Sequence, residues 1–102
     1  MNSYNKYTDL QINELVATRL KKKCLLTEES VLAYMDSGYR TFAPCNNPTD
    51  AMPIIIENEI SMIKSSGGWM CCHGSVGLVE RESLYRGAME VFLMMKDAEN
   101  NQ

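Results

Sequence analysis

Histidine, tryptophan and positive charge are scarce in this 102-residue sequence, and these shortages narrow the functions open to it. His73 is the single histidine, so it is the only side chain expected to exchange protons readily near neutral pH. The formal net charge is −3, whereas proteins that bind nucleic acid generally carry a basic face. We therefore do not expect nucleic acid among the partners of this chain.

Long apolar runs are also absent. No stretch approaches the roughly 20 apolar residues that cross a lipid bilayer, and the polar residues Asn2 to Leu10 do not resemble a signal peptide. We expect a cytoplasmic protein with no membrane partner, whose four cysteines are reduced thiols. The length is that of one domain, residues 1–102, in which residues 1–7 and 98–102 are expected to be loose.

The cysteines lack the spacing of a metal site. Zinc motifs favour cysteine pairs separated by two residues, whereas Cys71 and Cys72 are adjacent and would lie on opposite faces of a strand. Only Cys71 and His73 share a face, so we expect neither a metal nor another cofactor. Cys45 and His73 could form a nucleophilic pair, because such partners need not be neighbours in sequence. No oxyanion-stabilising or orienting motif accompanies them, so buried thiols and a histidine at a strand end are the simpler interpretation.

The hydrophobic pattern predicts helices at both ends of the chain. Thr8-Asp9-Leu10-Gln11 fits a capping box, and apolar residues then recur at helical spacing. Ser83 can cap a final helix, whose residues 91–95 are apolar all round and therefore need cover on more than one side. Residues 27–38 fit a further helix that begins at Thr27, with the arm of a β-hairpin as the alternative.

Strands are expected between these helices. Residues 24–26 and 39–43 are typical of short extended segments. Ile60 to Lys64 and Trp69 to His73 flank Ser65-Ser66-Gly67-Gly68, which predicts a β-hairpin with glycines where positive φ is needed. We therefore expect an α/β domain of the α+β kind. It is a small layered domain with a short, mainly antiparallel sheet that includes the hairpin at about 60–73, packed by three or four helices.

The most distinctive segment runs from Phe42 to Asn58. Asn46-Asn47-Pro48 is a strong turn signal, and the proline keeps a helix from beginning before it. Thr49 is expected to be the N-cap, with the Asp50 carboxylate complementing the helix dipole in the first turn. Ile54-Ile55-Ile56 covers more than half of the helix circumference, which predicts cover on two sides by a sheet and by a second helix or subunit.

The loop before this helix is the main candidate for binding. Backbone amides of residues 46–49 could face a small anionic ligand, although Asp50 already supplies negative charge there and a self-capped turn is the simpler interpretation. Arg40, Arg81 and Arg86 could converge on a phosphate, although their separation in sequence does not bring them together. The candidate ligand- or partner-binding residues are Cys45, Asn46, Asn47, Asp50, Trp69, His73 and Arg86, and no catalytic residue is assigned.

A set of distinctive motifs is spread over most of the chain. They are Asn13-Glu14-Leu15-Val16-Ala17, Cys45-Asn46-Asn47-Pro48-Thr49-Asp50-Ala51, Pro53-Ile54-Ile55-Ile56-Glu57-Asn58, Ile60-Ser61, Trp69, Arg86-Gly87-Ala88-Met89 and Val91-Phe92-Leu93-Met94-Met95. Together they resemble the NinX-type family of small accessory proteins of tailed bacteriophages and prophages. That family carries tryptophan where this chain has Met52. The resemblance implies a compact layered α/β domain made during infection in a bacterial cytoplasm, and it implies no catalytic residue.

Three hypotheses for the function follow. The first is a non-enzymatic phage accessory protein that acts by binding, with a host protein as its partner. Self-association into a homo-oligomer is also expected, because two helices need cover on several sides. The alternative is sequestration of a small nucleotide-like ligand by residues 46–50, with Trp69 and an arginine. The third is a small enzyme that uses Cys45 and His73.

Overall fold

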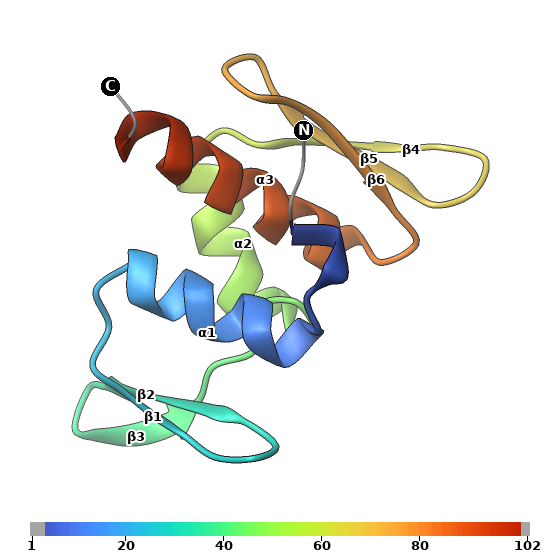
Figure 1. Ribbon diagram of the computed structural model, residues 1–102. Coiled ribbons are helices and arrows are strands. Elements are labelled where there is room, and N and C mark those ends of the chain that lie inside the picture. Colours follow the sequence, from blue (N-terminus) through green and yellow to red (C-terminus); the bar gives the residue numbers. More distant parts are fainter. Residues whose placement is uncertain (1–3, 101–102) are drawn as a thin grey trace.

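Three α-helices lie between two separate antiparallel sheets in the computed structural model, which describes residues 4–100 of the chain (Figure 1). The elements follow in the order η1 (Tyr4–Lys6), α1 (Asp9–Arg19), β1 (Cys24–Leu26), β2 (Val31–Met35), β3 (Gly38–Thr41), α2 (Pro48–Glu57), β4 (Ser61–Lys64), β5 (Trp69–His73), β6 (Gly77–Arg81) and α3 (Leu84–Asn100). The expected α+β class and antiparallel pairing are confirmed, with two sheets in place of one. Within this range no helix combines the length and apolar character needed to cross a membrane.

The helices form a layer that each sheet covers from a different side. Sheet A consists of β1, β2 and β3 with β2 in the middle, and sheet B consists of β4, β5 and β6 with β5 in the middle. Sheet A packs against α1, at the bottom of Figure 1, and sheet B packs against α3, at the top right. Because α3 also contacts α1 and α2, it is the central element of the fold.

The central position of α3 explains its unbroken apolar segment. Val91, Phe92 and Leu93 are consecutive, and none of them has any exposed surface. Three successive residues point in three directions around a helix, so all can be buried only where neighbours surround it. The prediction that this helix needs cover on more than one side is confirmed. The predicted cap is also present, since the Ser83 hydroxyl accepts a hydrogen bond from the Arg86 backbone N–H at 3.4 Å.

The helix predicted at residues 27–38 is wrong, and the alternative of a hairpin arm is right. Thr27 does act as a cap, but its hydroxyl accepts from the N–H groups of Glu29 and Ser30 in a turn. Residues 31–35 then form the central strand of sheet A, where alternate side chains Val31 and Ala33 are buried. The short apolar run fits the residue spacing of a helix and that of a strand. It forms a strand because it pairs with β1 on one side and with β3 on the other.

The hairpin predicted at about residues 60–73 is confirmed. Lys64 pairs with Trp69, and the Ser65 N–H donates to the Gly68 carbonyl at 2.9 Å across the loop. The sequence did not indicate that β6 would continue this sheet. The expectation of positive φ in the loop is wrong, because the glycine with positive φ is Gly77, at 98°.

Gly68 is required for close packing, so Gly68→Ala is expected to lower the free energy of unfolding by about 3 kcal/mol. A Cβ atom at this position would lie 2.4 Å from the backbone oxygen of Arg81. The backbone at residue 68 or at Arg81 would have to move to relieve this overlap, at a large energetic cost. Gly67→Ala is the matched control, since a Cβ there meets nothing within 4 Å. Urea denaturation of both variants checks the prediction. Equal stability of the two would show that the contact is easily relieved.

The helix α2 begins two residues earlier than its predicted cap implied. Asn47 is the N-cap, because its side-chain oxygen accepts from the Thr49 N–H at 2.9 Å and Pro48 occupies the first helical position. The predicted N-cap at Thr49 is therefore wrong, whereas Asp50 does lie in the first turn. The predicted two-sided cover is only partly realised, since Ile54 and Ile55 are buried but Ile56 is 68% exposed.

The chain ends are more structured than expected. Residues 4–6 form a turn of 3-10 helix in which Tyr4 is buried, and α3 continues to Asn100. The Tyr4 hydroxyl donates to the Asp97 carboxylate, which also pairs with Arg19. These contacts tie the first described residues to the last turns of α3. The remaining residues predicted to be loose, 1–3 and 101–102, lie outside the described range.

Candidate functional site

The candidate residues from the sequence occupy three separate places. Cys45, Asn46 and Asn47 lie in the connection from β3 into α2, and Asp50 lies in the first turn of α2. Trp69 and His73 lie at the two ends of β5, and Arg86 lies in the first turn of α3. The connection into α2 meets α1, because the Asn46 side-chain amide donates to Asp9 at 3.1 Å. The Trp69 ring instead lies under the ammonium group of Lys64, 5.6 Å from its centroid.

The connection into α2 is a self-capped turn, as the simpler interpretation held. The Asp50 carboxylate accepts from the Ala43 N–H at 2.9 Å, and the Asn47 side chain accepts from the Thr49 N–H. The Asn47 carbonyl takes the N–H groups of Asp50 and Ala51. Amides that could have faced an anion are therefore bonded within the protein.

Cys45 and His73 show no geometry of a nucleophilic pair. Cys45 is 1% exposed, and burial raises the pKa of its thiol to about 12, with a further contribution from the Asp9 carboxylate. A thiol with so high a pKa holds little of the reactive thiolate at neutral pH. His73 is engaged locally, with its Nδ1 atom 2.8 Å from the Ser75 hydroxyl and accepting from the Ser75 N–H at 3.1 Å.

The adjacent cysteines of β5 point to opposite faces of sheet B, as predicted. Cys71 is fully buried under α3, and its thiol donates to the Leu84 carbonyl at 3.5 Å. Burial raises the pKa of this thiol to about 11. Cys72 lies on the other face and is partly exposed. Within residues 4–100 no group of histidine, cysteine and carboxylate side chains is arranged to hold a metal ion.

Two of the three arginines do converge, but on a carboxylate of the protein itself. Glu90 has no exposed surface, and both of its oxygens accept from Arg81, each at 2.9 Å. Arg86 donates to the same carboxylate at 2.6 Å, while Arg40 pairs with Asp36 at the surface. Glu90 is not among the candidate residues from the sequence. A charged residue within the otherwise apolar run of residues 87–95, four positions after Arg86, was the available signal.

Arg86 connects three segments around this buried carboxylate. Its guanidinium also donates to Asp9 at 2.8 Å and to the backbone carbonyls of Tyr4 and Tyr7 at 2.9 and 2.7 Å. Burial alone lowers the pKa of Arg86, but the hydrogen bonds to Asp9 and Glu90 outweigh it and raise the pKa overall. With its donors used inside the protein, Arg86 holds α3, α1 and the N-terminal segment together.

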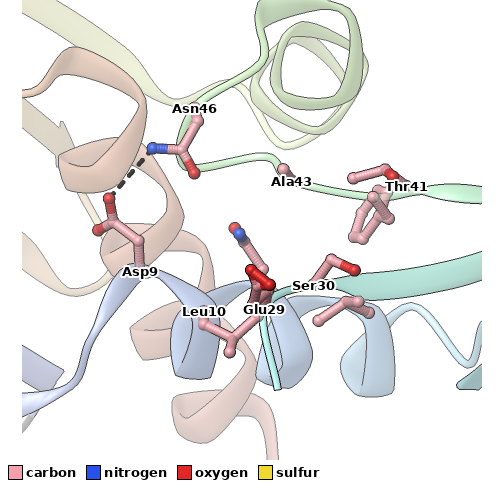
Figure 2. Close-up of a pocket in the computed structure, with 10 residues that line it drawn as sticks. Asp9, Leu10, Glu29, Ser30, Thr41, Ala43 and Asn46 are labelled. Carbon is pink, nitrogen blue, oxygen red and sulfur yellow. Dashed lines mark hydrogen bonds between the residues drawn. The ribbon is translucent and has the colours of Figure 1, made fainter. Parts of the chain in front are cut away.

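A cavity of about 240 Å³ lies between α1 and sheet A, beside the connection into α2 (Figure 2). Its lining residues are Asp9, Leu10, Asn13, Glu29, Ser30, Val31, Thr41, Phe42, Ala43 and Asn46. Figure 2 shows Asp9 and Asn46 at one end and Ser30 and Thr41 at the other, with Glu29 between them. Asn46 is the only candidate residue from the sequence that lines the cavity.

Within residues 4–100, each sheet has an outer face that no helix covers. In sheet A, Leu25 pairs with Leu32 and Tyr34 pairs with Tyr39, so these four side chains share the face opposite Val31 and Ala33. The exposed fractions of Leu25, Tyr34 and Tyr39 are 51%, 47% and 37%. In sheet B, the corresponding face carries Ser61, Ile63, Met70, Cys72, Leu78 and Glu80. Large apolar surface is thus left uncovered on both sides of the domain.

Comparison with known proteins adds no further constraint on these sites. No model of a known protein family matches the chain, and no curated protein is significantly similar to it.

Proposed function

We propose that this chain is a non-enzymatic accessory protein of a bacteriophage or prophage, which acts in the bacterial cytoplasm by binding a host protein. The phage origin rests on the resemblance to the NinX-type family. The binding function rests on one observation, the uncovered outer face of sheet A with its exposed leucine and tyrosine side chains. Contiguous apolar surface of this kind marks sites of protein–protein contact.

The composition of this face suits a partner protein. Tyrosines are enriched at the energetic centres of interfaces, where charged side chains are depleted. The Tyr34 and Tyr39 rings are arranged edge to face with centroids 5.3 Å apart, so each restrains the other before a partner arrives. The Lys23 ammonium group lies 5.9 Å from the centroid of the Tyr34 ring and places a positive charge at the margin of this face. A partner surface with apolar groups and an acidic rim would complement this face.

The geometry of the reactive groups favours binding over catalysis. The Cys45 and Cys71 thiols are buried with raised pKa values. Arg86 donates only to groups of the protein, and His73 is bonded to Ser75. None of these residues meets another in the arrangement of nucleophile and base that covalent catalysis uses.

Self-association is proposed for the other sheet. The outer face of sheet B exposes Ile63 and Leu78, at 50% and 57%, beside Met70 and Cys72. Exposed aliphatic side chains are typical of the more hydrophobic interfaces of permanent homodimers. The two faces lie on different sheets, so a dimer formed through sheet B leaves the face of sheet A free.

Paired substitutions on the two faces test this assignment. The tagged chain is recovered from its bacterial host during infection and measured by native mass spectrometry. Tyr34→Ala with Tyr39→Ala is expected to weaken capture of the host protein by about 30-fold or more, because loss of about 2 kcal/mol is typical when a tyrosine at the energetic centre of an interface is removed. The matched control, Ile63→Ala with Leu78→Ala, is expected to retain the host protein and to reduce the homodimer.

Two results would contradict the proposal. Equal capture by both double variants would show that the face of sheet A is not the binding surface. A small bound mass on an otherwise homomeric species, with no host protein, would favour ligand sequestration instead.

A further inference from the structure

The cavity between α1 and sheet A has an excess of negative charge. Of the residues that the structure describes, Asp9 and Glu29 line it, and no lysine or arginine does. Asp9 is already neutralised, because its carboxylate accepts from Arg86 and from Asn46. Glu29 is exposed, and among the described residues its carboxylate has no hydrogen-bond or ion-pair partner, so it can accept from a cation. An anionic ligand such as a phosphate would be repelled here.

Asn13 presents a hydrogen-bond donor to the same cavity. It is only 4% exposed, and its side-chain oxygen is fixed by the Cys45 N–H at 2.9 Å. Its NH₂ group therefore points away from Cys45 and, within residues 4–100, has no partner. A donor held in a largely buried side chain gains by meeting an acceptor on a ligand. Asn46 adds the opposite group, because Asp9 takes its NH₂ and leaves its side-chain oxygen as an acceptor.

The size of the cavity limits the ligand to one small unit. About 240 Å³ is below the range of roughly 300–1,000 Å³ typical of sites for drug-sized molecules. Leu10, Val31 and Phe42 supply apolar lining for a short hydrocarbon group. The ligand must therefore combine a positive charge for Glu29, an acceptor for Asn13 and a modest apolar part.

We infer that this cavity binds the N-terminal residue of a peptide chain. Its α-ammonium group would donate to the Glu29 carboxylate and the Asn46 oxygen, and its first carbonyl would accept from the Asn13 NH₂. A lysine or arginine side chain carries no acceptor for the Asn13 NH₂ group. A neutral nucleobase could accept from Asn13 but carries no positive charge for the Glu29 carboxylate. The site is independent of the proposed function, since Val31 belongs to the inner face of sheet A.

The inference is tested on the full chain by ¹⁵N–¹H NMR with four small probes. Leucinamide is the reference, and each of the other three probes changes one of its groups. Leucinamide has both the ammonium and the carbonyl, N-acetyl-leucinamide lacks the charge, and isopentylamine lacks the carbonyl. Leucine has a carboxylate in place of the carboxamide of leucinamide and represents a free amino acid. Leucinamide is expected to bind with a dissociation constant on the order of 1 mM, as befits so small a ligand. It should shift the Asn13 side-chain NH₂ signal and the backbone amides around Glu29 and Asn46.

The other three probes are expected to bind at least tenfold more weakly than leucinamide. Glu29→Gln is expected to weaken leucinamide binding about tenfold, because a charge-assisted hydrogen bond becomes a neutral one. Glu28→Gln is the matched control, since Glu28 is also exposed but does not line the cavity, and it should leave binding unchanged.

Several outcomes would overturn the inference. One is the absence of a saturable shift with leucinamide at millimolar concentrations, and another is equal binding of N-acetyl-leucinamide. Equal binding by Glu29→Gln would remove the role of the carboxylate. Leucine binding as tightly as leucinamide would assign the site to free amino acids and not to peptide chains. None of these results depends on the outer face of sheet A, so they leave the test of the proposed function separate.

Discussion

Replacing Glu90 by glutamine is expected to lower the free energy of unfolding by about 3–5 kcal/mol. The carboxylate has no exposed surface and accepts from both Arg81 and Arg86. Glutamine keeps the shape but removes the charge and turns one acceptor into a donor that faces two guanidinium groups. The loss is large because Arg81 is left without its carboxylate partner and Arg86, among the described residues, keeps only the carboxylate of Asp9.

Urea denaturation at neutral pH measures this effect. Glu80→Gln is the matched control, because Glu80 is exposed and its carboxylate accepts only from the Ser65 hydroxyl among the described residues. We expect the control to change stability by less than about 1 kcal/mol. A loss for Glu90→Gln no greater than that of Glu80→Gln would show that the fold does not depend on the buried carboxylate.

Raising the pH above about 9 is the second change expected to have a large effect, and it should destabilise the folded chain. Burial raises the pKa of Cys45 from 9.0 to about 12 and that of Cys71 from 9.0 to about 11. For each thiol, at a pH between 9.0 and its raised pKa, the unfolded chain has lost the thiol proton and the folded chain has kept it. Because the folded state binds more protons, its stability falls as the pH rises. The stability that the two protonated thiols contribute is fully present below pH 9 and is lost as the pH rises.

The slope of stability against pH is the measurable quantity. Each thiol that ionises only in the unfolded state is expected to remove about 1.4 kcal/mol per pH unit. Tyr4 adds to the slope above pH 10, since burial and its hydrogen bond to Asp97 raise its pKa from 10.0 to about 12. Urea denaturation at several pH values from 8 to 11 gives the slope for the unmodified chain.

A pair of core variants separates this effect from general weakening. Cys45→Ala removes the titrating group and should flatten the slope by about 1.4 kcal/mol per pH unit. Val79→Ala also removes buried volume but no titrating group, so it should keep the slope of the unmodified chain. Equal slopes for the two variants would show that ionisation of Cys45 does not govern alkaline stability.

The sequence by itself determined the features whose two partners lie a few residues apart. The capping box is one, because Thr8 and Gln11 bond each other reciprocally at the start of α1. The turn that opens α2 is another, since Asn47 and Pro48 fix its start locally. The hairpin loop closes between Lys64 and Trp69. In each case the physical cause is short-range, so local sequence is sufficient.

Tertiary structure alone decided the rest, because its causes act between residues far apart in the chain. The segment after Thr27 became strand β2 only through pairing with β1 and β3, and β6 joined sheet B through its register with β5. The charges of Arg81, Arg86 and Glu90 are visible in the sequence, but burial of Glu90 depends on sheet B closing over α3. The cavity requires α1, β2 and the connection into α2 to meet. The uncovered faces exist because none of the helices in the described part of the chain packs outside either sheet.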